Sequence, residues 1–252
     1  MEESNKFPLH EAARDGRTRV VESLLNENLK LASQQDDDGR LAIHWAISFN
    51  HKDIVNLLVS TMNFDPDVQD GSGWTPLMIA ASLKDGEEIV DILLRKDADI
   101  NARSKSYSQE SNDLLSTQKI LLDKLTALHL IASKKNIDLA RRLLNHKPAA
   151  SARLCDKRGQ YPIHRAAAIG SVPMVELLIK HNSPINAADI SGQTPLHHAI
   201  AEGHGDTAIS LLKAGVDTKK RDSDDKLALE LAPDSQVSKF IIRQVELEGI
   251  EL

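Results

Sequence analysis

The chain has 252 residues, of which 41% are apolar and 3% aromatic, and its formal net charge is −6. This charge argues against nucleic acid as the main ligand, because phosphate binding needs a basic face. No apolar run approaches the ~20 residues of a membrane-spanning helix, and the start of the chain has no apolar secretory segment. The single cysteine, Cys155, excludes an internal disulfide and fits a reducing compartment. We therefore expect a soluble cytoplasmic and nuclear protein.

Similar strings recur along the chain at a nearly constant interval. They read "KFPLHEAARDG", "GRLAIHWAISFN", "GWTPLMIAASLKDG", "KLTALHLIASKKN", "GQYPIHRAAAIGS", "GQTPLHHAIAEGH" and, in a degenerate copy, "KLALELA". One column of these strings holds His10, His44, Met78, His129, His164, His197 and Glu230, with spacings of 34, 34, 51, 35, 33 and 33 residues. The period and the T-P-L-H motif are typical of ankyrin repeats. The sequence thus predicts an all-α ankyrin-repeat solenoid of about seven repeats with β-hairpin finger loops.

Each repeat reads as a turn, a short inner helix and a longer outer helix. In the third repeat "DGSGWTP" is the turn, Thr75 fits the N-cap position, and Pro76 fits the first helical position. The outer helix "EEIVDILLRK" places Ile89, Ile92 and Leu93 on one stripe. We expect one domain over residues 4–252, with repeats at 4–36, 37–69, 70–102, 123–156, 157–189, 190–222 and, as a C-terminal cap, 223–252.

The interval of 51 residues marks an insertion between the third and fourth repeats, at residues 103–121. Its first part is rich in Ser, Gln and Asn and cannot bury enough apolar surface to fold. We expect a flexible loop that extends a finger, with a tail, "LLSTQKILL", that could add a short helix. A tolerated loop expansion is the simplest interpretation.

The last copy departs from the pattern, as the end of a repeat array should. It has Ala228 in place of the proline and Glu230 in place of the histidine. The segment "QVSKFIIRQVELE" predicts a closing helix with Phe240, Ile241 and Val245 buried.

The recurring histidine predicts a structural role, in which the side chain bonds backbone between neighbouring fingers. The adjacent pair His197 and His198 points in directions about 100° apart on a helix, which suits a shared metal poorly. The chain lacks the P-loop, nucleophile-elbow and H-E-x-x-H motifs. We therefore predict no enzymatic activity, no catalytic residue, no cofactor and no metal.

Two columns of side chains are left free by the repeat and are predicted to face the concave side. The column before the T-P-L-H match holds Lys6, Arg40, Trp74, Leu125, Gln160, Gln193 and Lys226. The column after the histidine holds Glu11, Trp45, Ile79, Leu130, Arg165, His198 and Leu231. Tryptophan and arginine anchor many interfaces, so these columns are candidates for partner binding. Packing of Trp45 and Trp74 between inner helices, and simple solvation of the charged fingers, are the alternatives.

Several stretches resemble the gankyrin-type ankyrin-repeat proteins, which are seven-repeat assembly chaperones of the 26S proteasome regulatory particle. The similar stretches are "DDDGRLAIHWAISFN", "DGSGWTPLMIAAS", "DKRGQYPIHRAAAIGS" and "HAIAEGHGD". The resemblance spans the chain apart from residues 103–121, an insertion that this family does not typically carry. It implies binding of the C-terminal domain of one proteasomal ATPase subunit on the concave face, through complementary charged patches. We expect the free chain to be a monomer. The implied contacts are Asp36, Asp38, Arg40, Trp45, Asp70, Trp74, Lys134 and Arg165.

The sequence therefore predicts a protein-binding chaperone that assists assembly of the 26S proteasome regulatory particle. The alternative is a general ankyrin adaptor, or a kinase-inhibitor-like scaffold, with another partner. An enzyme would need a site in the insertion that no motif reveals.

Overall fold

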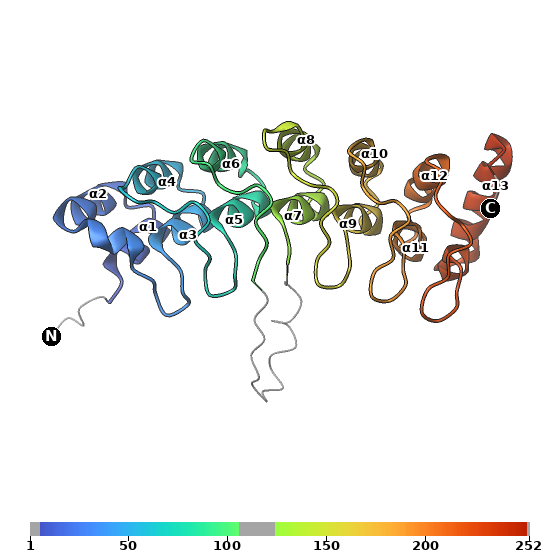
Figure 1. Cartoon of the computed structure of the whole chain (residues 1–252), viewed down its shortest axis with the longest axis horizontal. Helices are drawn as coiled ribbons and strands as arrows, with labels where there is room; N and C mark the ends of the chain where they lie inside the picture. Colours follow the sequence, from blue (N-terminus) through green and yellow to red (C-terminus); the bar gives the residue numbers. More distant parts are fainter. Residues whose placement is uncertain (1–5, 106–123, 251–252) are drawn as a thin grey trace, which may run out of the picture. The chain divides into compact units, whose positions relative to one another are not determined.

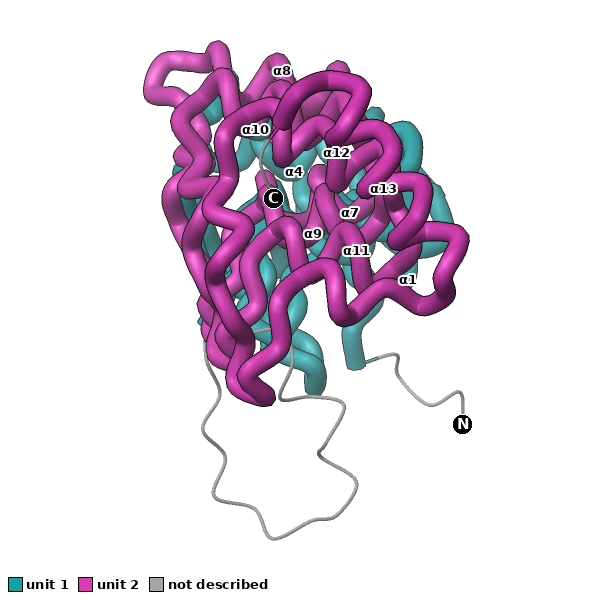
Figure 2. Tube along the Cα trace, turned by 90° about the vertical axis from the view of Figure 1, so that its right-hand side faces the viewer, with its two compact units in different colours: residues 1–127 teal, residues 128–252 magenta. Residues whose placement is uncertain are grey.

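The computed structural model describes residues 6–105 and 124–250, and its Cα trace divides into two compact units, residues 1–127 and 128–252 (Figure 2). The helices of unit 1 are α1 (Pro8–Arg14), α2 (Thr18–Glu27), η1 (Leu29–Ser33), α3 (Ala42–Ser48), α4 (Lys52–Val59), α5 (Pro76–Ser82) and α6 (Glu87–Leu94). Those of unit 2, the first of which begins at the last residue of unit 1, are α7 (Ala127–Ser133), α8 (Ile137–Asn145), α9 (Pro162–Ala168), α10 (Val172–Lys180), α11 (Pro195–Ala201), α12 (Gly205–Lys213), η3 (Ala228–Leu231) and α13 (Ser235–Glu248).

Helices alternate between two rows within each unit. In unit 1 the short helices α1, α3 and α5 form an inner row, and α2, α4 and α6 form an outer row (Figure 1). In unit 2 the outer row contains α8, α10, α12 and α13, and the inner positions end with the 3-10 helix η3. This alternation of short inner and longer outer helices is the arrangement that the sequence predicts. The single domain over residues 4–252 stays a prediction.

The apolar residue before the histidine column forms the core of each repeat. Leu9, Ile43, Leu77, Leu128, Ile163 and Leu196 are all at most 3% exposed. The seventh member, Leu229, is half-buried because η3 replaces a full inner helix there. None of the described helices is long and apolar enough to cross a membrane.

Each of the five histidines of the column joins its repeat to the segment that follows, as predicted, whereas Met78 of the third repeat offers no such bond. His44 Nδ1 accepts the Leu41 N–H at 3.0 Å, and its Nε2 lies 3.1 Å from the Val68 carbonyl oxygen of the following segment. Because an amide N–H only donates and a carbonyl only accepts, Nε2 carries the proton and the ring is neutral. The Nε2 atoms of His10, His129, His164 and His197 likewise lie 3.0 to 3.3 Å from carbonyl oxygens of Gln34 and Arg40, Gln160, Ala187 and Lys226.

Burial favours the same neutral form. It lowers the pKa of His44 and His197, and burial together with the nearby His198 lowers the pKa of His164 to about 4. Protonation would place a second proton on Nδ1, opposite an amide N–H, and would break the bond within the repeat. His44, His164 and His197 are therefore structural groups whose ring nitrogens are both used in bonds to the backbone.

The fingers are tight turns, and among the described residues they contain no extended strand, only an isolated bridge between Arg221 and Leu227. The Asp36 N–H donates to the Arg40 carbonyl at 2.9 Å, which closes the turn. Neighbouring fingers are joined directly by backbone bonds, such as the 2.9 Å bond from the Gly71 N–H to the Asp38 oxygen. Gly71 is required there, because a Cβ would lie 2.2 Å from that oxygen.

The insertion lies inside the fourth finger. Ser104 takes the place that Asp36 and Asp70 take in earlier fingers, and its N–H donates to the Leu125 carbonyl at 2.9 Å. The Leu125 N–H in turn donates to the Ser104 hydroxyl, across 21 residues instead of the four that separate Asp36 and Arg40. The extra residues therefore belong between Ser104 and Leu125. Residues 106–123, which include most of the predicted loop and its possible helix, lie outside the described residues.

The closing helix α13 forms as predicted, with one exception. Ile241 and Val245 are at most 2% exposed, but Phe240 is 39% exposed. Phe240 lies over Gly205, where a Cβ would come within 2.6 Å of its ring, and the rest of the ring stays exposed. The prediction that Phe240 is buried was therefore wrong.

We expect Leu93→Ala to lower the free energy of unfolding by about 2–5 kcal/mol, because Leu93 is fully buried in α6 and its truncation leaves a cavity. Thermal unfolding followed by circular dichroism measures this. A melting temperature within a degree of the parent protein would show that this helix contributes little to the core.

Lowering the pH from 7 to 5 should also destabilise the fold. His164 stays neutral in the folded chain down to its pKa of about 4, whereas its ordinary value is 6.5. The unfolded chain therefore binds more protons between these values, and stability is lost as the pH falls through this window. We expect His164 to contribute about 2 kcal/mol of the loss. Urea unfolding at both pH values measures the loss, which should be smaller in His164→Asn. An equal loss in both proteins would contradict the role given to His164.

Candidate protein-interaction surface

One aspartate closes each finger that leads into the second to the seventh repeat, except the fourth finger, which leads into the fourth repeat. Asp36 Oδ1 accepts hydrogen bonds from the backbone N–H groups of Asp38 at 3.0 Å and Arg40 at 2.8 Å. Four further aspartates bind the residues two and four positions later in the same way, namely Asp70, Asp156, Asp189 and Asp222. The first carboxylate oxygen is thus used by the turn, and the second oxygen is left for a side chain.

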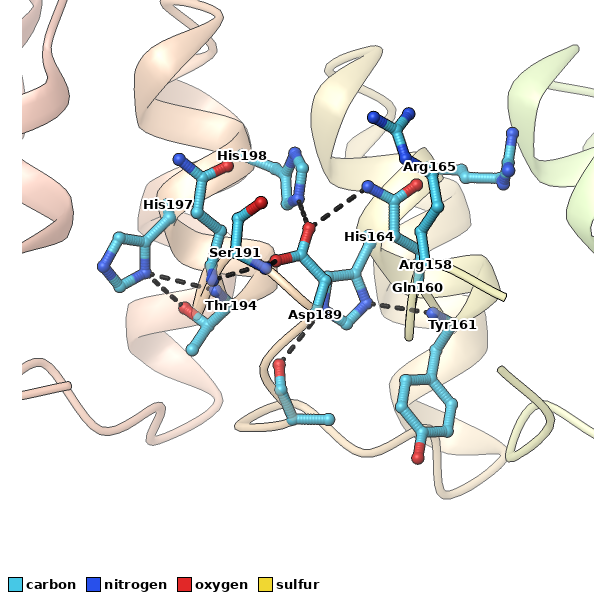
Figure 3. Close-up of polar contacts among 12 residues, drawn as sticks. Arg158, Gln160, Tyr161, His164, Arg165, Asp189, Ser191, Thr194, His197 and His198 are labelled. Atoms are coloured by element: carbon cyan, nitrogen blue, oxygen red, sulfur yellow. Dashed lines mark hydrogen bonds and ion pairs between the residues drawn. The ribbon is translucent and has the colours of Figure 1, made fainter. Parts of the chain in front are cut away.

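The second oxygen binds a side chain from the column after the histidine. Trp45 Nε1 donates to Asp36 Oδ2 at 2.7 Å, and Arg165 Nη2 donates to Asp156 Oδ2 at 2.7 Å. His198 Nε2 lies 2.9 Å from Asp189 Oδ2 (Figure 3). In all three cases the partner lies nine residues after the aspartate, on the inner helix. A tryptophan, an arginine and a histidine are therefore oriented by one common geometry.

The column before the T-P-L-H match reaches the same carboxylates from the preceding finger. Arg40 Nε donates to Asp70 Oδ2 at 3.3 Å, and Gln160 Nε2 donates to Asp189 Oδ2 at 3.2 Å (Figure 3). In the third repeat the inner-helix position is apolar Ile79, so Arg40 binds Asp70 without a competitor there. Arg40 and Gln160 of one predicted column and Trp45, Arg165 and His198 of the other therefore converge on finger carboxylates, which hold these side chains in place. The prediction that the whole of both columns is free was wrong for Ile79 and Leu125, which are 5% and 1% exposed.

Hydrogen bonds keep these carboxylates ionised despite their burial. Burial raises the pKa of Asp36, but the bonds from Trp45 and from the Arg40 and Asp38 N–H groups outweigh it and leave the pKa below its ordinary value. Burial likewise raises the pKa of Asp189, and the bonds from His198, Gln160 and two backbone N–H groups again lower it overall. Asp36 and Asp189 are therefore fixed negative charges at neutral pH.

Six of the predicted contact residues lie in unit 1, and four of these form a connected cluster. The Arg40 guanidinium carbon lies 4.8 Å from the centre of the Trp45 ring, while Asp36 binds the Trp45 indole and Asp70 binds Arg40. The Asp70 side chain is only 1% exposed, so it acts in this cluster by positioning Arg40. A cation–π contact and a carboxylate bond together fix the guanidinium.

The remaining predicted residues are placed separately. Asp38 is exposed next to the cluster. Trp74 is half-buried, and its backbone N–H donates to Asp70 Oδ1. Lys134 and Arg165 belong to unit 2, where Lys134 is exposed and the Arg165 side chain is 23% exposed and paired with Asp156.

The fourth finger lacks the carboxylate that anchors side chains in the other fingers. Ser104 replaces the aspartate, and the two columns hold Leu125 and Leu130, so no carboxylate and no polar partner occur together. Elsewhere, no group of three or more potential metal ligands occurs among residues 6–105 and 124–250. His197 bonds towards the next finger and His198 towards Asp189, so the two rings serve different partners.

Two ranges of the chain, residues 9–104 and 128–222, match a family model described as ankyrin repeats (3 copies). These ranges include more than half of the residues, and the chain therefore belongs to the ankyrin-repeat family. The solved ankyrin repeat domain of Bcl-3 has a TM-score of 0.72 at 24% identity, covering 96% of this chain and 100% of that one. The human ASB11 ankyrin repeat domain has a TM-score of 0.69 at 20% identity, covering 94% and 97%. These two structures show the same fold.

Within this family, two fungal relatives match along nearly their whole length. The probable 26S proteasome regulatory subunit p28 of Saccharomyces cerevisiae is 36% identical over 96% of this chain and 100% of its own. An ankyrin repeat-containing protein of Schizosaccharomyces pombe is 32% identical over 92% of each chain. The match to p28 confirms the gankyrin-type resemblance predicted from the sequence.

We expect Asp70→Asn to lower the free energy of unfolding by about 1–2 kcal/mol, because the amide places a donor against the Arg40 guanidinium. Trp45 fluorescence should change as Arg40 is released from the ring. Asp37→Asn is the matched control, because Asp37 pairs with Lys6 at the surface and both side chains are at least 68% exposed. Equal stability of the two variants would contradict the positioning role of Asp70.

Proposed function

We propose that the chain is a non-enzymatic chaperone that binds the C-terminal domain of a proteasomal ATPase subunit and assists assembly of the 26S regulatory particle. The observation that carries the proposal is the full-length match to a probable proteasome regulatory subunit. The ATPase domain as the partner, the free monomer as the acting form, and a cytoplasmic and nuclear location are parts of the proposal. By its bulk, the bound chaperone would hinder premature docking of the ATPase onto the proteolytic core.

The inner-helix surface supports this proposal. Arg40, Trp45 and Arg165 are each held by a carboxylate, so a partner that meets them loses little side-chain freedom on binding. Asp36, Asp38, Asp70 and Trp74 in unit 1, and Lys134 in unit 2, complete the proposed contacts. Of these, the buried Asp70 contributes through Arg40.

The charges of the two units differ in sign. Residues 1–127 hold 14 lysines and arginines against 22 acidic residues, a net charge of −8. Residues 128–252 hold 17 against 15, a net charge of +2. This asymmetry favours a partner with a basic and an acidic region, and it would set orientation and association rate more than affinity.

Isothermal titration calorimetry against the isolated C-terminal domains of the six proteasomal ATPases of the same organism tests the proposal. We expect one-to-one binding to one of them and at least tenfold weaker binding by Arg40→Gln. A glutamine should fit there, because Gln160 makes the equivalent bond to Asp189 in unit 2. Arg95→Glu, at the exposed end of α6, is a control that should bind as the parent does.

Binding to none of the six domains would refute the proposal and would favour an ankyrin adaptor with another partner. Binding that Arg40→Gln leaves unchanged would keep the partner and remove Arg40 from the site.

A further inference from the structure

An exposed aromatic ring, Phe49, lies beside the Arg40 and Trp45 cluster of unit 1. It follows the last residue of α3 and is 52% exposed. Its ring centre lies 6.3 Å from that of Trp45 at an interplanar angle of 25°, and 6.4 Å from that of His51 at 9°. These separations are too long for rings that cover one another's faces, so Trp45 and His51 flank the Phe49 ring and leave part of its face open.

The row Arg40, Trp45, Phe49 and His51 is fixed at both ends. Asp70 holds Arg40 at one end, and at the other end His51 Nε2 bonds the Arg14 carbonyl oxygen at 2.9 Å. Gly16 leaves room for the His51 ring, because a Cβ there would come within 2.7 Å of it. Phe49 therefore lies at the surface between Trp45 and His51, which are themselves bonded to Asp36 and to the Arg14 backbone.

The position of Phe49 in its repeat matches that of a residue already among the proposed contacts. Phe49 comes five residues after His44, and Lys134 comes five residues after His129. The proposed contact surface thus includes this position in the fourth repeat. Exposed aromatic residues held rigidly at such a position are the type that dominates binding energy.

The same unit already binds cations on aromatic rings. Besides Arg40 over Trp45, the Lys6 ammonium lies 4.9 Å from the centre of the Phe7 ring. The net charge of −8 over residues 1–127 further attracts cations to this unit. Neither Arg40 nor Lys6 lies over Phe49, whose ring is open to a cation from outside.

We infer that Phe49 is a further partner contact, and that it binds a lysine or arginine side chain of the partner through a cation–π interaction. This inference rests on the proposed function and adds to it the chemistry of one contact. The side chain would lay its aliphatic stem along the Trp45 and Phe49 rings and its charge over the Phe49 face.

The test measures the affinity of full-length Phe49 variants for the ATPase domain that binds the parent protein. We expect Phe49→Ala and Phe49→Leu both to weaken binding by about fivefold or more, and Phe49→Trp to stay within about twofold of the parent. Leucine keeps the apolar surface and loses the aromatic ring, so it separates a cation–π contact from simple apolar contact. Met62→Ala is the control, because Met62 is 84% exposed in the same unit and lies outside the row, between α4 and α5.

Two results would overturn the inference while leaving the proposed function intact. Parent-like affinity of Phe49→Ala would remove Phe49 from the site. Parent-like affinity of Phe49→Leu alone would show that the contact is apolar and that no cation is bound. Failure of the parent protein to bind any ATPase domain would refute the proposed function itself, and this inference with it. Circular dichroism of each variant confirms that the fold is kept, as expected for a side chain this exposed.

Discussion

A neutral imidazole that accepts an N–H of its own repeat and donates to a carbonyl oxygen further along the chain is the recurring interaction that links these repeats, although Met78 stands in its place in the third repeat. His44 and His164 show it most fully, because both ring nitrogens have partners whose roles are fixed. An inner helix of only seven residues cannot bury its own apolar face. Each repeat is therefore stabilised by its neighbours, and these histidine bonds fasten one repeat to another. The burial that lowers the pKa of these rings keeps them in the one protonation state that satisfies both partners.

The finger aspartates orient the side chains on the surface of the stacked repeats. One oxygen of each carboxylate shapes the turn, and the other oxygen orients a side chain from the inner helix or the preceding finger. The scaffold can therefore vary the exposed residue, as between Trp45, Arg165 and His198, while the geometry of its anchor stays constant. Such anchoring suits a protein whose surface must recognise one partner, because the side chains are ordered before binding.

Much of this architecture could be predicted from the sequence, because the same residue pattern recurs in several repeats. The histidine column, the core leucines and isoleucines, and the two surface columns were all predicted from spacing alone. The resemblance assigned Asp36 and Asp70 as acidic contacts, but it could not show that the turn consumes one oxygen of each, or that Asp70 is buried under Arg40. The anchoring pairs join residues nine or about thirty positions apart, an interval that no helical or strand periodicity reveals.

Single departures from the repeat were the hardest to predict. Phe49 shares its column with Asp15, Leu83 and Lys134, so no pattern distinguishes it. Phe240 follows an apolar stripe, but it covers Gly205 with only part of its ring and is 39% exposed. The inserted finger could be located by its spacing, but its closure by Ser104 and Leu125 became clear only from their backbone bonds.

A crystal structure of the chain bound to its ATPase domain would test the central claim most directly. Our account predicts that Arg40 and Arg165 keep their bonds to Asp70 and Asp156 in the complex and contact the partner from these fixed positions. An ATPase domain seated on the outer helices, or arginines that leave their aspartates to reach the partner, would contradict it.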